Sequence, residues 1–334
     1  MRCAYLAFTE KGLALARRLA ETLPGSVSRC GAGEGRVSLA DWTAAQFARS
    51  EALIFVGAAG IAVRAIAPNC RSKAADPAVV VLDECGRFAI PLLSGHLGGA
   101  NDLAAQLAAA CGAVPVITTA TDANGLFAVD SWAKANGCAV LEPERIKHVS
   151  GALLAGESVY YASEFPIAGT PPRGVGMAGE GQTPDFVLTL APGKAAPAAL
   201  HLVPKIAVLG VGCKRGTSAA QLEAAFAAFC ACYGLAPAGI TAAASIDLKQ
   251  NEPGLAAFCA AHGWPVTFYT AEELRGTPGD FTPSAFVARV TGVDNVCERA
   301  AVRAAGGPLV CPKFAGGGVT LALAARPFAP DWRK

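Results

Sequence analysis

Two polar side chains, Ser94 and His96, lie among glycines in the segment Ile90–Ala108, where an apolar strand-like run changes into a helical pattern. Glycine lets a backbone adopt positive φ and approach a ligand closely, and the glycines here are Gly95, Gly98 and Gly99. A helix that begins after them offers free N–H groups and a positive dipole end to an anion or an oxyanion. We expect Asn101 or Asp102 to cap this helix. A structural connection in which His96 only packs is the alternative interpretation.

A second polar cluster follows the strand that we expect at residues 113–117. Its members within five residues are Thr118, Thr119, Thr121 and Asp122. Such groups are costly to bury without partners, so we expect them to face a cleft. The alternative is an ordinary turn that caps a helix over residues 129–135.

Glycine turns follow two other predicted strands. After the strand at 52–56, Gly57 leads into a helix that carries Arg64, and this turn marks a predicted binding edge at the carboxyl end of the strand. Near residue 210 the spacing is GxGxxxG, followed by Lys214 and Arg215 at a helix start, which predicts a carboxylate cradle. Neither turn matches the dinucleotide or the P-loop fingerprint.

The remaining pattern alternates strands and helices, which predicts an α/β protein of several domains with mainly parallel sheets. We expect domains at 1–132, 133–203 and 204–334, with a loop at 166–184, a linker at 191–204 and a mobile tail. Further strands are expected at 3–8, 37–39, 78–82, 158–162, 186–190, 205–210, 239–246, 265–269, 309–311 and 319–324. A turn at 83–87 should join two strands as a hairpin, and Asp41 should cap a helix at 41–48.

Composition excludes several classes of protein. Of 334 residues, 53% are hydrophobic and 16% are charged, and the net charge of +2 comes without a basic block, so we expect neither disorder nor nucleic-acid binding. No apolar run is long enough to span a membrane, and the N-terminus does not resemble a signal peptide. Twelve scattered cysteines without a CxxC pair predict reduced thiols in the cytoplasm and no metal held by the protein.

These motifs resemble the cobalt-precorrin-5A hydrolase (CbiG) family of anaerobic cobalamin biosynthesis. The resemblance covers nearly the whole chain, and LLSGHLGGAN followed by TTATD is its most specific part. It rests on Gly57–Arg64, Pro91–Asn101, Val116–Asp122, Leu209–Cys213, Ala244–Lys249, and Thr291–Val293 with Glu298. The middle module contributes least to it.

The resemblance implies a reaction in which water opens the δ-lactone of cobalt-precorrin-5A. The methyl-bearing carbon extruded in ring contraction then leaves as acetaldehyde, giving cobalt-precorrin-5B. The implied enzyme needs no cofactor, because the cobalt arrives as part of the corrinoid substrate. The oligomeric state is not predicted.

Lactone opening requires a base, a stabilised oxyanion and a proton donor. We expect His96 to be the base, since its ordinary pKa of about 6.5 lets it exchange protons near neutrality. The amides of Gly98 and Gly99 could receive the oxyanion, and Asp122 could orient His96 or act as a second base. Direct attack by water ranks above a covalent mechanism through Ser94, because there is no GxSxG elbow.

The substrate carries many carboxylates, which suit basic side chains. We expect these to be Arg64, Lys214, Arg215 and Lys249, in a site between the first and last modules. Further substrate contacts are expected from Ser94, Gly95, Gly98, Gly99, Asn101, Thr118, Thr119 and Thr121.

Two other classes of function remain open. One is a non-catalytic corrinoid-binding or hand-over protein, whose last module would dock neighbouring pathway enzymes. The other is a nucleotide-binding α/β enzyme, which the failure of both phosphate fingerprints disfavours.

Overall fold

The computed structural model describes residues 1–72 and 75–334, which form two compact units. The first contains Met1–Trp132 and Ser150–Glu157, and the second contains Ala133–Val149 and Ser158–Lys334. Three mixed, largely parallel sheets alternate with helices, so the α/β prediction is confirmed. Within the described ranges, no helix combines the length and the apolar character that crossing a bilayer demands.

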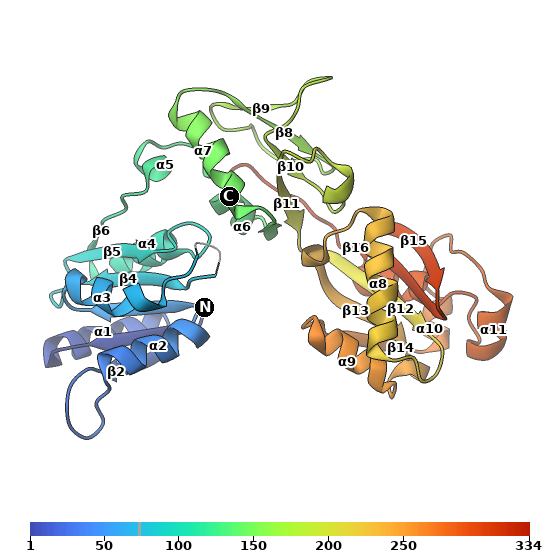
Figure 1. Ribbon diagram of the computed structural model, residues 1–334, viewed down its shortest axis with the longest axis horizontal. Coiled ribbons are helices and arrows are strands. Elements are labelled where there is room, and N and C mark those ends of the chain that lie inside the picture. The colour runs from blue at the N-terminus through green and yellow to red at the C-terminus, as the bar shows by residue number, and fades with distance from the viewer. Residues whose placement is uncertain (73–74) are drawn as a thin grey trace. The chain divides into compact units, whose positions relative to one another are not determined.

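The first unit is built on a six-stranded sheet of order β2-β1-β3-β4-β5-β6 (Figure 1). The strands are β1 (Cys3–Ala7), β2 (Gly25–Arg29), β3 (Ala52–Val56), β4 (Ala78–Leu82), β5 (Phe88–Leu93) and β6 (Val114–Pro115). The helices are α1 (Glu10–Thr22), α2 (Leu39–Arg49), α3 (Ala59–Ile66) with the 3-10 turn η1 (Ala67–Asn69), α4 (Ala100–Cys111), α5 (Ala120–Ala123) and α6 (Val129–Ala135).

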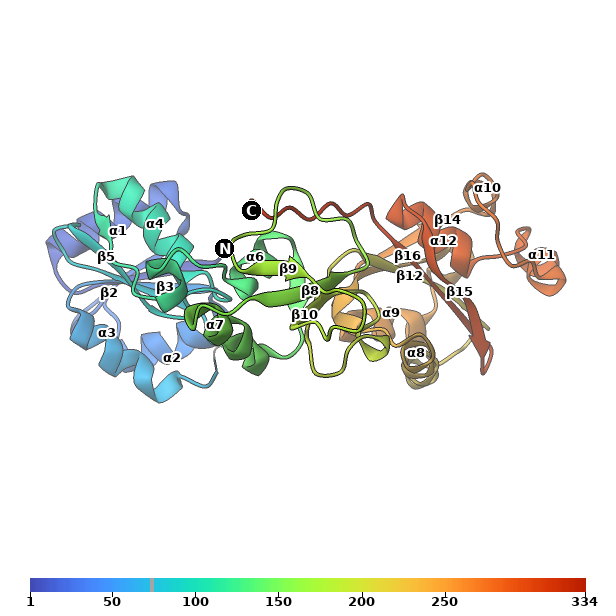
Figure 2. The ribbon, with the colours of Figure 1, turned by 90° about the horizontal axis from the view of Figure 1, so that it is seen from above.

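Strands β1, β3 and β4 are buried along their whole length, because helices cover both faces of this sheet. Leu19 of α1 and Leu107 of α4 pack on one face. Trp42 of α2 and Ile66 of α3 pack on the other, and Figure 2 shows α1 and α4 on one face of the sheet and α2 and α3 on the opposite face. Apolar runs without alternation are what such a doubly covered strand requires.

The predicted hairpin at 83–87 is confirmed, and it decides where the glycine-broken loop lies. Strand β5 runs antiparallel to β4, so that Leu93, its last residue, pairs with Val79 near the start of β4. Strand β3 is parallel to β4 and ends with Val56 opposite Leu82. The turn at Gly57, which we expected to mark the binding edge, therefore lies at the opposite edge of the sheet from the loop after Leu93.

Three local predictions in this unit are wrong. The second strand is β2 rather than residues 37–39, where Val37 forms only an isolated bridge with Cys30. Ser38, not Asp41, caps α2, because its extended backbone and side-chain oxygen precede the first turn. Strand β6 is only two residues long, and Pro115 has no N–H to donate to a longer ladder.

The second unit contains two sheets. One has the order β7-β11-β10-β8-β9. Its strands are β7 (Cys138–Val140), β8 (Val159–Ser163), β9 (Val175–Met177), β10 (Phe186–Leu188) and β11 (Leu200–Pro204). Between them the chain forms η2 (Pro143–Arg145), η3 (Pro192–Lys194) and α7 (Ile146–Leu154), whose residues from Ser150 on belong to the first unit.

Two segments that we predicted to be irregular belong to this sheet. Strand β9 lies in the expected loop, and the fully buried β11 lies in the expected linker. The polar His201 can be buried in β11 because its ring Nδ1 and its backbone N both lie 3.0 Å from Glu142 carboxylate oxygens.

The other sheet has the order β14-β13-β12-β16-β15. Its strands are β12 (Ala207–Cys213), β13 (Ile240–Ile246), β14 (Val266–Tyr269), β15 (Leu309–Gly316) and β16 (Val319–Ala325). Its helices are α8 (Ala219–Tyr233), α9 (Pro253–Ala261), α10 (Ala271–Arg275), α11 (Ala285–Thr291) and α12 (Cys297–Ala305), with η4 (Pro237–Gly239) and η5 (Asp247–Lys249). Helices α8 and α9 cover one face, and α10 and α12 cover the other (Figure 2).

The C-terminal tail, predicted to be mobile, is anchored within the second unit. Trp332 packs edge-on against Tyr161 at 4.9 Å and its backbone N–H bonds to Ala168. Asn136 and Asp331 exchange two hydrogen bonds between side chain and backbone. An aromatic anchor and paired backbone groups outweigh the proline-rich composition that suggested disorder.

Candidate active site

The loop between β5 and α4 is a tight turn that depends on its glycines. Ser94 has a φ of 58°, the only positive value for a non-glycine residue in the described ranges. A Cβ on Gly98 would lie 2.3 Å from Ser94 Cβ, and a Cβ on Gly95 would lie 2.8 Å from Asn101 Oδ1. Backbone held in this sparsely populated region is common at functional sites.

The cap of α4 differs from our expectation. Gly99, with a φ of 84°, is the N-cap, so neither Asn101 nor Asp102 caps the helix. Asn101 is instead buried in the first turn, and its side chain donates to Thr119 Oγ1 at 2.9 Å and to Asp122 Oδ2 at 2.8 Å. Asn101 therefore joins the loop to the polar segment 118–122.

His96 makes the second link between the same two segments. Its Nε2 lies 2.8 Å from Asp122 Oδ2, and Thr121 Oγ1 is 3.5 Å from the same nitrogen. The side chain of Asp122 is 38% exposed, whereas that of His96 is only 13% exposed. The meeting of the two segments that the sequence predicted is confirmed; the substrate cavity between them stays a prediction.

A third segment contributes a residue that sequence reasoning missed. Asp130, in the first turn of α6, lies with Oδ1 3.2 Å from His96 Nδ1, and its side chain is 8% exposed. The helix at 129–135 was predicted, but its single acidic residue was not considered. An acidic residue next to the apolar Val129, in the first turn of the predicted helix, is the signal that could have found it.

These carboxylates change the protonation of His96. Its hydrogen bond with Asp130 and the one with Asp122 outweigh burial and raise the pKa of His96 to about 9. At neutral pH the ring is therefore an imidazolium that donates from both nitrogens. The pKa near neutrality, on which we based its role as the base, does not hold in this environment.

The loop amides are partly occupied. Gly99 N–H donates to His96 O at 2.9 Å, so it is already used within the turn. In residues 1–72 and 75–334, no backbone acceptor is recorded for Gly98 N–H. Of the two amides that we expected to receive an oxyanion, Gly98 is the one that remains available.

The other predicted contacts in the first unit are less involved. Ser94 Oγ donates to the carbonyl of Asp76 at 2.9 Å, so its proton is already committed. Thr118 is exposed on the segment that leads to Asp122. Arg64 is exposed on α3, and its Nη1 lies close to Gly60 of the same helix.

The predicted carboxylate cradle after β12 is filled by the protein itself. Gly216 N–H donates to Glu252 Oε2 at 2.9 Å, and Lys249 Nζ lies 2.9 Å from Glu252 Oε1. Both side chains of this ion pair are at most 15% exposed. Lys214 and Arg215 are exposed in the same turn. Lys249 is thus neutralised internally, whereas Arg215 faces solvent.

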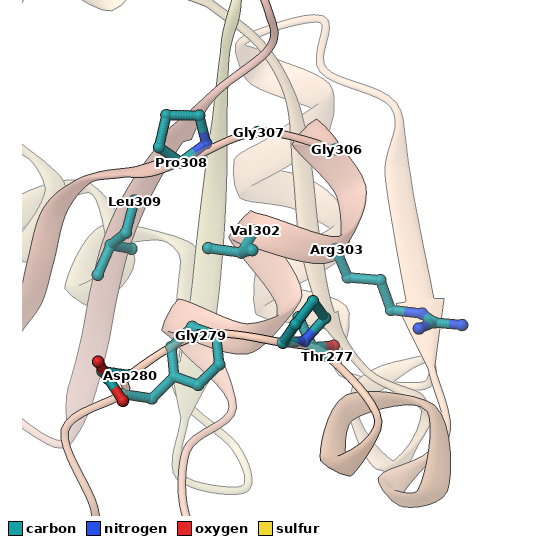
Figure 3. Close-up of a pocket in the computed structure, with 11 residues that line it drawn as sticks. Thr277, Gly279, Asp280, Val302, Arg303, Gly306, Gly307, Pro308 and Leu309 are labelled. Atoms are coloured by element: carbon teal, nitrogen blue, oxygen red, sulfur yellow. The ribbon is translucent and has the colours of Figure 1, made fainter.

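The second unit also contains a pocket with a volume of about 610 Å³. It is lined by Thr277–Phe281, Val302, Arg303 and Gly306–Leu309 (Figure 3). The pocket residue Leu309 pairs with Ala324 of β16, and the next residue, Ala325, pairs with Ala207 at the start of β12. The turn that carries Lys214 follows the opposite end of β12. The pocket therefore contains none of the predicted site residues.

All twelve cysteines are free thiols. Within the described residues, no three or more His, Cys, Asp or Glu side chains gather in a way that could hold a metal ion.

Comparison with known proteins gives matches over both units. A family model described as "Cobalamin synthesis G N-terminal" matches residues 41–122, and one described as "Cobalamin synthesis G C-terminus" matches residues 207–324. The cobalt-precorrin-5A hydrolase of Salmonella typhimurium is 35% identical over 338 residues, which cover 96% of each chain. That of Priestia megaterium is 31% identical over 84% of this chain and 80% of the relative.

Two solved structures are also similar. A cobalamin biosynthesis protein G homolog from Sulfolobus solfataricus gives a TM-score of 0.42 at 22% identity, covering 98% of this chain and 97% of the other. CobE, from the cobalamin biosynthetic pathway, gives a TM-score of 0.35 at 34% identity, covering 38% of this chain and 94% of the other.

Proposed function

The chain belongs to the CbiG family of cobalamin synthesis proteins, and from that premise we propose that it is a cobalt-precorrin-5A hydrolase. Two relatives that carry this name match most of the chain at 35% and 31% identity. The chemistry requires water to open a δ-lactone and a carbon–carbon bond to break as acetaldehyde leaves. The observation that carries the proposal at the level of the site is the contact between His96 and Asp122 in the loop pair most specific to the family.

We assign the role of the base to Asp122. All recorded bonds to its carboxylate, from His96 and Asn101, go to Oδ2. No partner of Oδ1 is recorded in the described part of the chain, and the side chain is the most exposed of the group. An ionised carboxylate accepts protons only, so Oδ1 can take one from the attacking water.

His96 then acts as the proton donor. As an imidazolium it stabilises the charge of Asp122, and its Nε2–H can pass to the oxygen that leaves the carbonyl carbon. Asp122 takes the proton of the water on Oδ1, whereas its Oδ2 is the atom 2.8 Å from Nε2, so the carboxyl group turns over before it returns the proton to the ring. The Gly98 amide supports the oxyanion, and direct attack by water fits a Ser94 hydroxyl that is committed to Asp76.

We propose that the substrate's carboxylates bind to exposed basic side chains, among them Arg64, Lys214 and Arg215. Lys249 contributes less than we expected from the sequence, because Glu252 already neutralises it. We also keep as proposals that one substrate contacts both units and that the domains divide at residues 132 and 203. The cytoplasmic location of the protein and the docking of neighbouring pathway enzymes are further parts of the proposal.

The main competing function is a corrinoid-binding protein that hands the intermediate on without chemistry. The two functions differ in whether aldehyde is released. Incubation of the wild-type protein with cobalt-precorrin-5A, followed by trapping of acetaldehyde as a hydrazone, should give one equivalent of aldehyde per substrate consumed. Tight binding of the corrinoid with no aldehyde above the protein-free background would reject the hydrolase and favour the carrier.

A further inference from the structure

Asp130 has a position that a helix-terminus acid does not require. It lies in the first turn of α6, where a negative charge is favoured by the helix dipole, and its Oδ1 accepts from Ser131 N–H at 3.0 Å. Its side chain is nevertheless 8% exposed, and the same Oδ1 faces His96 Nδ1 at 3.2 Å. A buried carboxylate is costly unless it is paired, and the ring of His96 gives Asp130 a partner that can carry positive charge.

Both ring nitrogens of His96 face carboxylate oxygens, which determines where its hydrogens are. Nδ1 faces Asp130 and Nε2 faces Asp122. Ionised carboxylates are only acceptors, so each contact needs a hydrogen on the nitrogen. The ring can satisfy both contacts only as the doubly protonated cation.

We infer that Asp130 is the positioning residue of this site: it holds His96 by Nδ1, so that Nε2–H bonds to Asp122 Oδ2 and Asp122 presents Oδ1 to the substrate. This inference rests on the proposed function and goes beyond it, because Asp130 lies outside the matched range 41–122 and outside every motif of the sequence analysis. Its expected effect reaches the reaction only through His96.

The contact makes a specific prediction for the two reacting groups. Without the Asp130 carboxylate, the ring loses the partner that contributes most to its raised pKa, and the neutral form becomes accessible near pH 7. The neutral ring places its single hydrogen on Nε2, which faces the Asp122 carboxylate, and accepts at Nδ1 from the amide that Asp130→Asn introduces. A neutral imidazole is a much weaker acid than an imidazolium, so turnover would fall although both reacting side chains are present.

The test is an NMR titration of imidazole nitrogens in the full-length protein labelled with ¹⁵N-histidine. The chain has four histidines, and His96→Gln identifies the resonance. In the wild type His96 should titrate at about 9. In Asp130→Asn this value should fall by at least one unit, and the alkaline limit of kcat should fall with it, while Asp130→Glu should restore part of both.

The matched control is Glu223→Gln. It removes a carboxylate from a different histidine, because Glu223 Oε2 lies 2.8 Å from His262 Nε2. It should leave the titration of His96 unchanged. An unaltered His96 titration in Asp130→Asn would overturn the inference, and so would a wild-type value at or below the ordinary 6.5, which needs no variant to fold. The titration uses no substrate, so it tests the inference separately from the proposed function. If His96 titrated as expected but the protein released no aldehyde, the proposed function would be rejected and the role of Asp130 in positioning His96 would stand.

Discussion

Two strand-to-helix connections in this protein are rich in glycine but use their glycines differently. In the turn before α4, Gly95 and Gly98 make room for Asn101 and for a strained Ser94, and the turn presents a charged pair with one carboxylate oxygen available. Within β12, which leads into the second turn, a Cβ on Gly210 would lie 1.8 Å from Cys297 O, and one on Gly212 would lie 2.4 Å from Thr320 Oγ1. There the glycines serve close packing of the backbone.

The polar groups at the two turns differ in the same way. The amide of Gly216 and the ammonium of Lys249 are both satisfied by Glu252, so the second turn is closed upon the protein's own carboxylate. The first turn leaves Asp122 exposed at the end of a chain of contacts that begins at the buried Asp130. A glycine-rich strand-to-helix turn therefore indicates that other atoms come close to the backbone. The surrounding side chains show whether those atoms belong to the protein itself or to a ligand.

The largest expected effect is the loss of turnover in Asp122→Asn. The amide keeps the size of the side chain but cannot accept a proton from water, so kcat should fall by roughly 10²–10⁴-fold. The measurement is the rate of aldehyde release at saturating substrate. Asp102→Asn changes an exposed acid in the first turn of α4 and should keep wild-type turnover. Full activity in Asp122→Asn would show that the first turn is not the reactive one.

The next effect separates the uses of the two sets of glycines. Gly210→Ala should lower the free energy of unfolding by about 3 kcal/mol, because its Cβ meets backbone that cannot move aside. Gly98→Ala also meets backbone, at Ser94 O, but should in addition lower kcat at least tenfold, because it displaces Ser94 and with it His96. Urea denaturation and steady-state kinetics distinguish the two results.

Gly151→Ala is the control for both substitutions, since a Cβ there meets no atom within 4 Å. It should leave turnover unchanged and stability unchanged or slightly raised. If Gly210→Ala reduced turnover without loss of stability, the second turn would have a reactive role that its packing does not indicate.

A smaller effect is a difference in pH dependence. His96 has its pKa raised to about 9, so its contribution to stability is complete below about pH 6.5 and is lost as the pH rises through 9. It amounts to roughly 3 kcal/mol at most. Gly216 N–H and Lys249 lower the pKa of Glu252, so its contribution is present at neutral pH and is lost as the pH falls below the ordinary value.

Urea denaturation across pH 3–10 tests this difference. His96→Gln should remove most of the alkaline decline, and Glu252→Gln should reduce the acid decline. If the free energy of unfolding of His96→Gln fell at alkaline pH by as much as that of the wild type, the imidazolium of His96 would not be the group that stabilises the protein there.

How far the sequence could lead is clear from these same residues. The loop strings brought His96 and Asp122 together correctly, because a strand end and a neighbouring strand end meet at one edge of a sheet. Asp130 could not be found in this way, since its contact with His96 depends on where α6 packs. Lys249 can either face solvent or pair with a neighbouring carboxylate. The sequence spacing of Lys249 and Glu252 alone does not show which of the two occurs.

Fold prediction failed where polar or proline-rich segments had specific partners. Strand β11 was not predicted because it contains the polar His201, whose ring is paired with Glu142. The tail was predicted to be mobile because of its prolines, although Trp332 packs on Tyr161. Periodicity correctly gave the buried strands β3 and β4, because both of their faces are covered and no partner has to be known.

The smallest expected effect concerns two basic residues: Arg215 in the second turn, and Lys249 in η5, which shares the Glu252 carboxylate with that turn. Arg215 is exposed, so Arg215→Gln should raise KM for the corrinoid about twofold to fivefold and leave stability unchanged, which is the scale of one solvent-screened carboxylate contact. Lys249→Gln should do the reverse: it leaves Glu252 without its cation and should lower the free energy of unfolding by about 1 kcal/mol with little change in KM. A larger KM effect for Lys249→Gln than for Arg215→Gln would mean that the substrate displaces Glu252, and the second turn would then open to a ligand as the first one does.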